Sequence, residues 1–295
     1  MNEKSLIQII KTTLNSEYIG DDCAYLKDLG IVITQDSLVE DIHFKREFIT
    51  TFQLGYKTAM VNISDVCASG AKPMYMTISL SLPNSVDEEF VKEFYEGVKD
   101  ASKDIKIVGG DLTGSDKIYI SATAIGKTEG RKISSRSNAK ENYKIIVSGE
   151  HGSSAYGLNL LLNNKTEPEY FIKKHLMPVA QEEFSRQIAE NSTEDYAMMD
   201  TSDGLADALM QIAQASKVTL IIDSSKIPHA PQVDMETVLY GGEDYQLVAA
   251  VPEHLLKKLD AYTIIGEVKN GNTGLIIDGK VYTDIDEKLY KHFKE

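Results

Sequence analysis

Residues 127–142, with the sequence KTEGRKISSRSNAKEN, separate two stretches of the chain that each alternate between strand-like and helix-like patterns. The segment is polar and has an excess of basic residues, which is typical of a connection between domains. The chain has 295 residues, enough for two domains. We therefore expect one domain over residues 1–138 and a second over residues 139–295.

On the N-terminal side of this linker, an amphipathic helix is expected at the start of the chain, because Gln8 and Lys11 interrupt its apolar stretch. Gly109-Gly110-Asp111 is predicted to be a turn between two strands. The spacing of apolar residues predicts helices at 52–67 and 87–104 and strands at 74–82, 105–108 and 117–125.

On the C-terminal side, a loop is expected around Pro228 and Pro231, and short strands near the end of the chain. The other expected elements are strands at 144–149, 196–199, 218–223 and 245–251 and helices at 153–163, 179–190 and 204–215. This alternation predicts a mixed α/β fold (α+β in part) built from two domains of similar size.

The composition excludes several classes of protein. With 31 basic and 45 acidic residues, the net charge of −14 repels nucleic acid and anionic lipid, so a phosphate-bearing ligand needs a cation between it and the protein. No apolar run approaches the roughly 18 residues that span a membrane. Cys23 and Cys67 lack the spacing of a zinc site or a disulfide framework. We expect a cytoplasmic protein.

Acidic residues stand beside small residues at five places, four of them predicted turns next to strands and one, at Asp65, on the helix 52–67. For any single place, capping of a turn or helix is a sufficient explanation, as for Ser202 or Asp203 before a helix. The five places are Gly20-Asp21-Asp22, Thr34-Gln35-Asp36-Ser37, Asn62-Ile63-Ser64-Asp65, Gly109-Gly110-Asp111 and Asp200-Thr201-Ser202-Asp203-Gly204.

Taken together, the five places predict a metal site. The ends of adjacent strands converge in space, so several carboxylates would face one another. Two such charges 4 Å apart repel by about 4 kcal/mol at an effective dielectric constant near 20. Carboxylate and hydroxyl oxygens without His or Cys favour Mg²⁺ or Mn²⁺, and Mg²⁺ commonly shares its ligand shell with substrate phosphates.

Other phosphate and cation sites were weighed. The segment Asp200–Gly204 lacks the spaced ligands and the final Glu of an EF-hand calcium loop. No G-x-x-x-x-G-K-[ST] motif is present, so a P-loop is excluded. Residues 149–154 follow a strand and precede a helix, and either hold an anion at the helix N-terminus or only pack the strand against the helix.

Six motifs give the sequence a specific resemblance. In their order and spacing, it resembles the thiamine-monophosphate kinases, a family of the PurM-like (aminoimidazole ribonucleotide synthetase-like) superfamily, from about residue 18 to the C-terminal LYKHF. The motifs are GDDCAYL (20–26), TQDSLVEDIHF (34–44), NISDVCASGAKP (62–73), IVGGDLT (107–113), MMDTSDGL (198–205) and GGEDYQL (241–247).

The resemblance implies a two-domain PurM-like fold and direct transfer of the γ-phosphoryl group of ATP to thiamine monophosphate. It also implies a homodimer whose N-terminal sheets join, and an ATP- and Mg²⁺-binding N-terminal domain. It assigns several Mg²⁺ ions to Asp22, Thr34, Gln35, Asp36, Asp65, Asp111, Asp200 and Asp203. ATP contacts fall on Gly110, Asp111, Arg136 and Ser202, substrate contacts on His43, Glu243 and Tyr290, and catalytic roles on Asp36, Asp111 and Arg136.

The expected chemistry agrees with these residues. A phosphate monoester has a second pKa of ~6, so the attacking oxygen is already anionic and needs no dedicated base. Positioning and charge neutralisation then supply most of the catalysis. An acidic pocket with a Tyr suits the cationic thiazolium ring. Plain alternatives are a solvated Arg136, a structural His43 and a Tyr290 that only packs.

Two alternatives stay open: another ATP-dependent enzyme of the superfamily, similar to aminoimidazole ribonucleotide synthetase, or a non-catalytic binding homologue. Departures from the family pattern are Gln35 in place of Thr or Ser, Asp41 in place of Gly, an altered turn at 138–143 and no Arg after Pro178. Selenophosphate synthetases and the hydrogenase-maturation member are disfavoured, because the chain lacks their reactive Cys.

Overall fold

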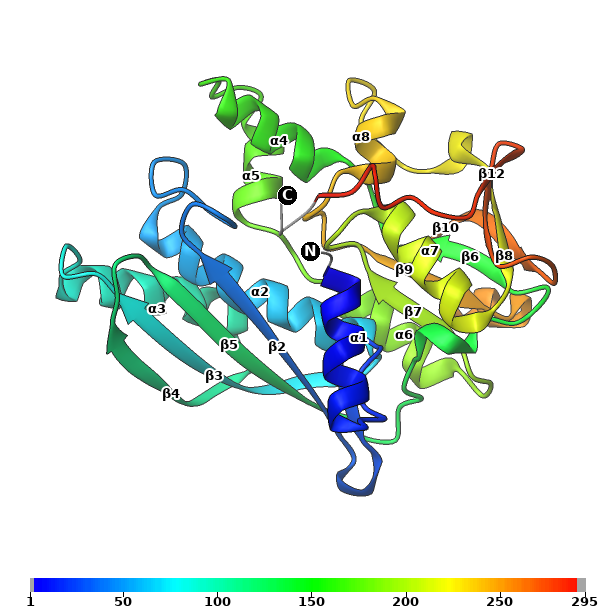
Figure 1. Cartoon of the computed structure of the whole chain (residues 1–295), viewed down its shortest axis with the longest axis horizontal. Coiled ribbons are helices and arrows are strands. Elements are labelled where there is room, and N and C mark those ends of the chain that lie inside the picture. The colour runs from blue at the N-terminus through cyan, green and yellow to red at the C-terminus, as the bar shows by residue number, and fades with distance from the viewer. Residues whose placement is uncertain (1–2, 291–295) are drawn as a thin grey trace.

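The structure is a computed structural model that describes residues 3–290. It contains two β-sheets, one on each side of the predicted linker, with a long helix between them (Figure 1). The expected mixed α/β fold is confirmed. The N-terminal helix α1 (Glu3–Leu14) is also present as predicted. No helix in the described part of the chain is long and apolar enough to cross a membrane.

The N-terminal sheet has five strands in the order β1-β2-β5-β3-β4. All neighbours are antiparallel except β3 and β4, which α3 connects. Helices α2 (Thr51–Ala68) and α3 (Glu88–Ser102) pack on one face. The strands are β1 (Ala24–Leu26), β2 (Ile31–Val39), β3 (Lys72–Leu82), β4 (Lys106–Gly114) and β5 (Tyr119–Lys127).

The C-terminal sheet has seven strands in the order β12-β11-β8-β10-β6-β9-β7. Its strands are β6 (Lys144–Val147), β7 (Ala197–Asp200), β8 (Thr219–Ile222), β9 (Leu247–Val251), β10 (Thr263–Lys269), β11 (Gly274–Ile277) and β12 (Lys280–Tyr282). The helices of this half are α4 (Ser153–Leu162), α5 (Glu169–Leu176), α6 (Glu182–Asn191), α7 (Leu205–Ser216) and α8 (Met235–Tyr240).

Helix α2 joins the two halves through a shared core. Successive residues of the central strands alternate between two apolar clusters, as the two-residue period of a strand requires. Ile146 and Met198 belong to the cluster around α2, whereas Ile145 and Ala197 belong to the cluster around α7. Because α2 also contacts β7 and α6, it is buried between the sheets and fixes their relative position.

A close crossing of α2 and α3 holds α2 in place. A Cβ atom at Gly55 would lie 1.9 Å from the backbone oxygen of Phe94, and one at Gly97 would lie 1.9 Å from that of Phe52. Only glycine allows the two backbones to approach this closely. At its start, α2 is closed by a capping box between Thr50 and Gln53.

Most predicted elements are present, but two predicted turns are wrong. Residues 34–37 lie inside β2, and Gly109-Gly110-Asp111 lies inside β4, where the parallel pairing to β3 places Gly110 opposite Ile78. Glycine and Asp favour turns locally, and the ladder of hydrogen bonds to a neighbouring strand overrides that preference. The short helices α5 and α8 were not predicted.

The predicted linker also differs from a solvated connection. Ser134 is buried and its Oγ donates to the carbonyl of Ala68 at 2.6 Å, and the Arg136 side chain is only 16% exposed. Residues 136–138 form a short 3₁₀ helix that contacts α7. The interpretation of Arg136 as a solvated basic residue is therefore wrong.

We predict that Gly97→Ala destabilises the fold, because the added methyl group overlaps the backbone of α2 and overpacking of this kind costs roughly 1–3 kcal/mol. Thermal unfolding followed by circular dichroism should show a melting temperature lower by several degrees. Gly114→Ala is the matched control, since no atom lies within 4 Å of its added Cβ. Equal melting temperatures for the two variants would contradict the close crossing.

Candidate functional site

Three carboxylates from distant parts of the sequence meet beside α2. Asp22 precedes β1, Asp65 lies on α2 and Asp200 ends β7, and one carboxylate oxygen of each lies within 4.8 Å of the others. Asp36 lies on the face of β2 that packs on α2, where its backbone N–H donates to Asn62 Oδ1 at 3.1 Å. The structure therefore brings together four of the predicted metal ligands.

Hydroxyl groups orient these carboxylates. Thr34 Oγ1 donates to Asp65 Oδ2 at 2.6 Å, and Ser64 Oγ donates to Asp200 Oδ2 at 2.7 Å. Ser202 Oγ donates to the other oxygen of Asp200 at 2.9 Å. Each bond fixes a carboxylate oxygen before any ligand arrives, which is the preorganisation that a cation site needs.

Burial and mutual repulsion disfavour the charged forms of the acids. Burial, together with the charge of Asp22, raises the pKa of Asp36 to about 6 and that of Asp200 to about 7. Burial and the neighbouring aspartates raise the pKa of Asp65 well above its ordinary value. Burial also raises the pKa of Asp22, although Arg136 opposes this shift. The carboxylates of the cluster thus outnumber the positive charges near them.

Arg136 is the cation that the chain itself supplies to this cluster. Its Nη2 donates to Asp22 Oδ1 at 2.9 Å and its Nη1 donates to Gln211 Oε1 at 2.5 Å. Gln211 in turn donates to Asp207, four residues earlier on α7. Asp21 accepts a hydrogen bond from the Arg136 backbone N–H at 2.7 Å. The guanidinium thus contacts one carboxylate of the cluster, that of Asp22, while the Arg136 backbone contacts Asp21.

The donor set fits a hard divalent cation. Oxygen atoms of Asp22, Asp65, Asp200 and Thr34 converge, and no His or Cys belongs to the group found within the described residues. Carboxylate and hydroxyl oxygens are the ligands that Mg²⁺ prefers. Raised pKa values are expected of such a site before a cation binds, because burial and mutual repulsion disfavour the charged carboxylates.

Asp111 and Gly110 lie elsewhere in the same chain. Strand register places Ser37, Ser121, Ser79 and Asp111 in one row, on the opposite face of the sheet from Asp36. Three strand spacings separate the ends of this row, about 14 Å in all. Asp111, Gly110 and Gln35 line a hollow of about 470 Å³ on that face. Gln35 Oε1 accepts a hydrogen bond from Thr123.

Two of the predicted substrate residues, Glu243 and His43, lie near each other: burial raises the pKa of Glu243, and Lys57, His175 and His43 lower it. His43 Nδ1 accepts a hydrogen bond from the Val39 backbone N–H at 3.0 Å, which agrees with a structural role. Glu243 pairs with Lys57 of α2 at 3.1 Å. Tyr290 is 62% exposed at the end of the described residues. Asp203 is exposed in the turn between β7 and α7.

The turn at residues 149–154 is explained by packing. The carboxylate of Asp244 accepts hydrogen bonds from the backbone N–H groups of Gly152 at 2.5 Å and Ser154 at 2.9 Å. It therefore occupies the N-terminus of α4, where a bound anion would otherwise interact. Of the two interpretations of this turn, the structural one holds.

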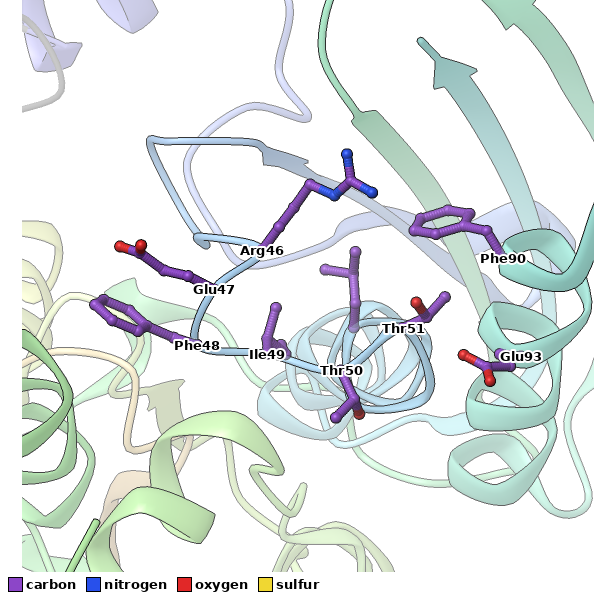
Figure 2. Close-up of a pocket in the computed structure, with 9 residues that line it drawn as sticks. Arg46, Glu47, Phe48, Ile49, Thr50, Thr51, Phe90 and Glu93 are labelled. Atoms are coloured by element: carbon purple, nitrogen blue, oxygen red, sulfur yellow. The ribbon is translucent and has the colours of Figure 1, made fainter. Parts of the chain in front are cut away.

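A separate surface hollow of about 420 Å³ lies between α3 and the loop after His43 (Figure 2). Arg46 extends toward the ring of Phe90, while Glu47 and Phe48 point the other way. None of the predicted site residues lines it. This hollow is therefore separate from the residues assigned to metal, ATP or substrate binding.

Four residues of the site were not predicted from the sequence: Lys57, His175, Asp207 and Gln211. A signal existed for three of these. Lys57 interrupts the otherwise apolar or small residues on the buried side of α2, and Asp207 and Gln211 are spaced four residues apart on one face of α7. The pairing of Lys57 with a loop 186 residues later could not be foreseen.

Comparisons with known proteins cover nearly the whole chain. The family AIR synthase related protein matches with its N-terminal domain at residues 20–128 and its C-terminal domain at 140–278. The chain is 37% identical to the thiamine-monophosphate kinase of Aquifex aeolicus (strain VF5), covering 99% of this chain and 98% of that protein. It is 35% identical to that of Bacillus subtilis (strain 168), covering 94% and 93%.

Solved structures agree with these matches. The structure of AaThiL complexed with AMPPCP and TMP superimposes with a TM-score of 0.91 at 36% identity, covering 99% of this chain and 97% of that chain. A structure of the hydrogenase maturation protein HypE in complex with ATP shares the fold at 18% identity, with a TM-score of 0.67, covering 99% and 95%.

We predict that Asp36→Asn stabilises the protein in EDTA at pH 8. The folded-state pKa of about 6 lies above the value near 4 of an unfolded Asp, so between pH 4 and pH 6 the folded chain keeps a proton that the unfolded chain has lost. At pH 8 the carboxyl is ionised in both states, and its buried charge destabilises the folded one. The associated stability is present below pH 4 and is lost as the pH rises through 6. Removing the charge should therefore restore about 1–3 kcal/mol at pH 8 and less at pH 5.

Thermal unfolding in EDTA at the two pH values measures this difference. Asp104→Asn is the control, because Asp104 is an exposed acid outside the cluster. Addition of Mg²⁺ should reverse the order at pH 8, with the unsubstituted protein becoming the more stable. A pH-independent difference between the Asp36→Asn variant and the unsubstituted protein would contradict the placement of Asp36 in the cluster.

Proposed function

The chain belongs to the thiamine-monophosphate kinases of the AIR synthase related family, and from this membership we infer that it transfers the γ-phosphoryl group of ATP directly to thiamine monophosphate, forming thiamine diphosphate. The observation that carries this function is the near full-length likeness to a structure that holds an ATP analogue and TMP. The chain is a kinase, and ATP is its co-substrate.

For the metal, we propose Mg²⁺ held by Asp22, Asp65 and Asp200, with Asp36 and Thr34 beside them. The convergence of their oxygens and the raised carboxylate pKa values support this proposal. When bound, Mg²⁺ neutralises carboxylate and phosphate charge. The backbone carbonyl of Gln35 is the ligand we assign to that residue, because its side chain lies on the other face of the sheet.

The protein residues then have defined tasks. The attacking oxygen of thiamine monophosphate is anionic near neutral pH, so no side chain has to remove a proton from it. Arg136 lies between the N-terminal acids and α7, and its guanidinium can also neutralise the charge that develops on the transferred group. Ser202, which orients Asp200, is placed beside the ATP phosphates in this proposal.

Substrate recognition is proposed to fall on Glu243, His43 and Tyr290. The carboxylate of Glu243 suits the cationic thiazolium ring, and the exposed Tyr290 ring offers an aromatic face for it. Asp203 is assigned to a further Mg²⁺ ion. Lys57, which holds Glu243, and Asp65 are eight residues apart on α2, about 12 Å along the helix axis, which supports the separation of Glu243 from the metal ligands.

A homodimer explains the position of Asp111. Strand β4 ends the sheet and is exposed along its length, with Val108 56% and Leu112 65% exposed. Strand β1 covers only residues 31–33 of β2, so residues 34–39 form a second edge within the described residues. We propose that β4 of one copy pairs with this edge of the other copy, which removes both edges and brings Gly110 and Asp111 to the partner's site.

The remaining expectations are kept as proposals. We propose that the ATP- and Mg²⁺-binding domain (1–138) meets the C-terminal domain (139–295) at the end of the short 3₁₀ helix Arg136–Asn138. A cytoplasmic location is proposed because both cysteines are free and buried. We propose no nucleic-acid or membrane partner, in line with the net charge of −14.

The first test of the function is incubation with ATP, Mg²⁺ and thiamine monophosphate, followed by mass spectrometry. We expect thiamine diphosphate and ADP in equal amounts, and no product when EDTA replaces Mg²⁺. Asp36→Asn is the control for contaminating kinases and should lose at least 100-fold in turnover. The absence of thiamine diphosphate at every Mg²⁺ concentration would refute the proposed function.

The dimer proposal predicts complementation between two inactive variants. Asp36→Asn and Asp111→Asn should each abolish turnover. If Asp111 serves the partner's site, a mixed dimer contains one intact site, and re-associated equal mixtures should recover about a quarter of the unsubstituted activity. If Asp111 serves its own chain, each site in every mixed dimer carries a defect and no activity returns. Measurement of turnover before and after subunit exchange separates the two arrangements.

A further inference from the structure

Lys57 is the most deeply buried charged side chain near the site that the proposed mechanism does not use. It lies on α2, and its side chain is 1% exposed. Its Nζ donates to Glu243 Oε2 at 3.1 Å, the one acceptor that the described residues provide. Removing one partner of a buried pair is strongly destabilising, because it leaves an uncompensated charge. Such a lysine persists in a core only where its partner is held in place.

Glu243 is held in place by its backbone. It lies in the loop between α8 and β9, and its φ of +64° is in the left-handed region that few non-glycine residues adopt. Its N–H donates to the carbonyl of Ser202 at 2.6 Å, in the turn after β7. Tyr245 also has a positive φ, of +49°. The loop thus presents the Glu243 side chain to α2 in one conformation.

A third residue completes the contact. His175 of α5 lies with Nδ1 3.4 Å from Glu243 Oε2 and 3.1 Å from Ser154 Oγ. Burial, followed by the charge of Lys57, lowers the pKa of His175 to about 4, so its ring is neutral near pH 7. Burial raises the pKa of Glu243, but Lys57, His175 and His43 together lower it, and the net shift is downward. Lys57 contributes most to this lowering, through both its charge and its hydrogen bond.

We propose that Lys57 is a positioning residue for thiamine monophosphate, which holds Glu243 Oε2 from the N-terminal half of the chain so that the other carboxylate oxygen meets the cationic part of the substrate. Both Lys57 and His175 contact the same oxygen, Oε2, no hydrogen bond among the described residues involves Oε1, and the Glu243 side chain is 26% exposed. The proposal rests on the proposed function, because it takes Glu243 to be a substrate contact.

A positioning role differs measurably from a structural ion pair. A purely structural role would lower stability and affect both substrates equally. A positioning role acts through Glu243 alone, so it should change the KM for thiamine monophosphate and leave that for ATP unchanged. It should also disappear when Glu243 no longer carries a charge, because coupled residues show non-additive effects.

Steady-state kinetics on purified full-length variants test the proposal. We expect Lys57→Met to raise the KM for thiamine monophosphate at least tenfold, with the KM for ATP within about twofold of the unsubstituted enzyme. Lys57→Arg should restore most of the affinity, since it keeps the charge. The double variant Lys57→Met/Glu243→Gln should be no worse than Glu243→Gln. Lys92→Met is the matched control, because Lys92 pairs with Glu89 at the same distance of 3.1 Å on the surface of α3.

Three results would overturn the proposal in distinguishable ways. An unchanged KM for thiamine monophosphate in a folded Lys57→Met variant makes Lys57 a structural residue only. An unchanged KM in Glu243→Gln removes Glu243 from the substrate site and the proposal with it. No thiamine diphosphate from the unsubstituted enzyme refutes the function itself. If Lys57→Met does not fold, two other comparisons of the KM for thiamine monophosphate test the proposal. They compare Lys57→Arg with the unsubstituted enzyme and the double variant with Glu243→Gln.

Discussion

The repulsion among Asp22, Asp65 and Asp200 is the constraint around which the molecule is built. Three carboxylates with oxygens within 4.8 Å of one another oppose folding unless protons or cations neutralise them. The chain answers with hydroxyl donors at Thr34 and Ser64 and with a single guanidinium, that of Arg136. These contacts orient the oxygens without cancelling their charge, and the raised pKa values of the acids record the deficit. Without a cation, this cluster therefore lowers the stability of the folded protein, and the same cluster can bind a divalent cation together with phosphates.

Helix α2 holds Asp65 of this cluster, and Lys57, at fixed positions. It lies between the two sheets and is fixed against α3 by a glycine crossing that allows no added methyl group. Along its buried length it presents Lys57 toward Glu243, then Asn62, Ser64 and Asp65 toward the acids of β2 and β7. One rigid helix therefore spaces the proposed substrate contact from the metal cluster. A shift of α2 along its axis would disturb both places at once.

The sequence revealed the chemistry of the site more fully than its geometry. Motif composition pointed to Asp22, Asp36, Asp65 and Asp200, and the structure brings these acids together beside α2. The same reasoning placed Asp111 and residues 34–37 in turns, because Gly and Asp favour turns when judged locally. Strand pairing decides otherwise, and with it which face each side chain occupies. Lys57 was beyond reach for a related reason, since its partner is 186 residues away and the pairing exists only after the two halves have packed.

The structure shows how the excess of acidic residues in the sequence is distributed. Nine acids of the motifs (Asp21, Asp22, Asp36, Asp65, Asp111, Asp200, Asp203, Glu243 and Asp244) account for nine of the 14 net negative charges. The structure divides them by task. Glu243 pairs with Lys57, and Asp244 accepts hydrogen bonds from the backbone of α4. Of Asp22, Asp65 and Asp200, by contrast, only Asp22 contacts a guanidinium among the described residues, that of Arg136. The unneutralised charge is thus concentrated where cation-bridged phosphates would bind, while the proposed substrate contact keeps a single oriented carboxylate for a cationic ring. The net negative charge of the protein repels phosphates, but cations bound at this cluster would allow it to bind two phosphorylated substrates side by side.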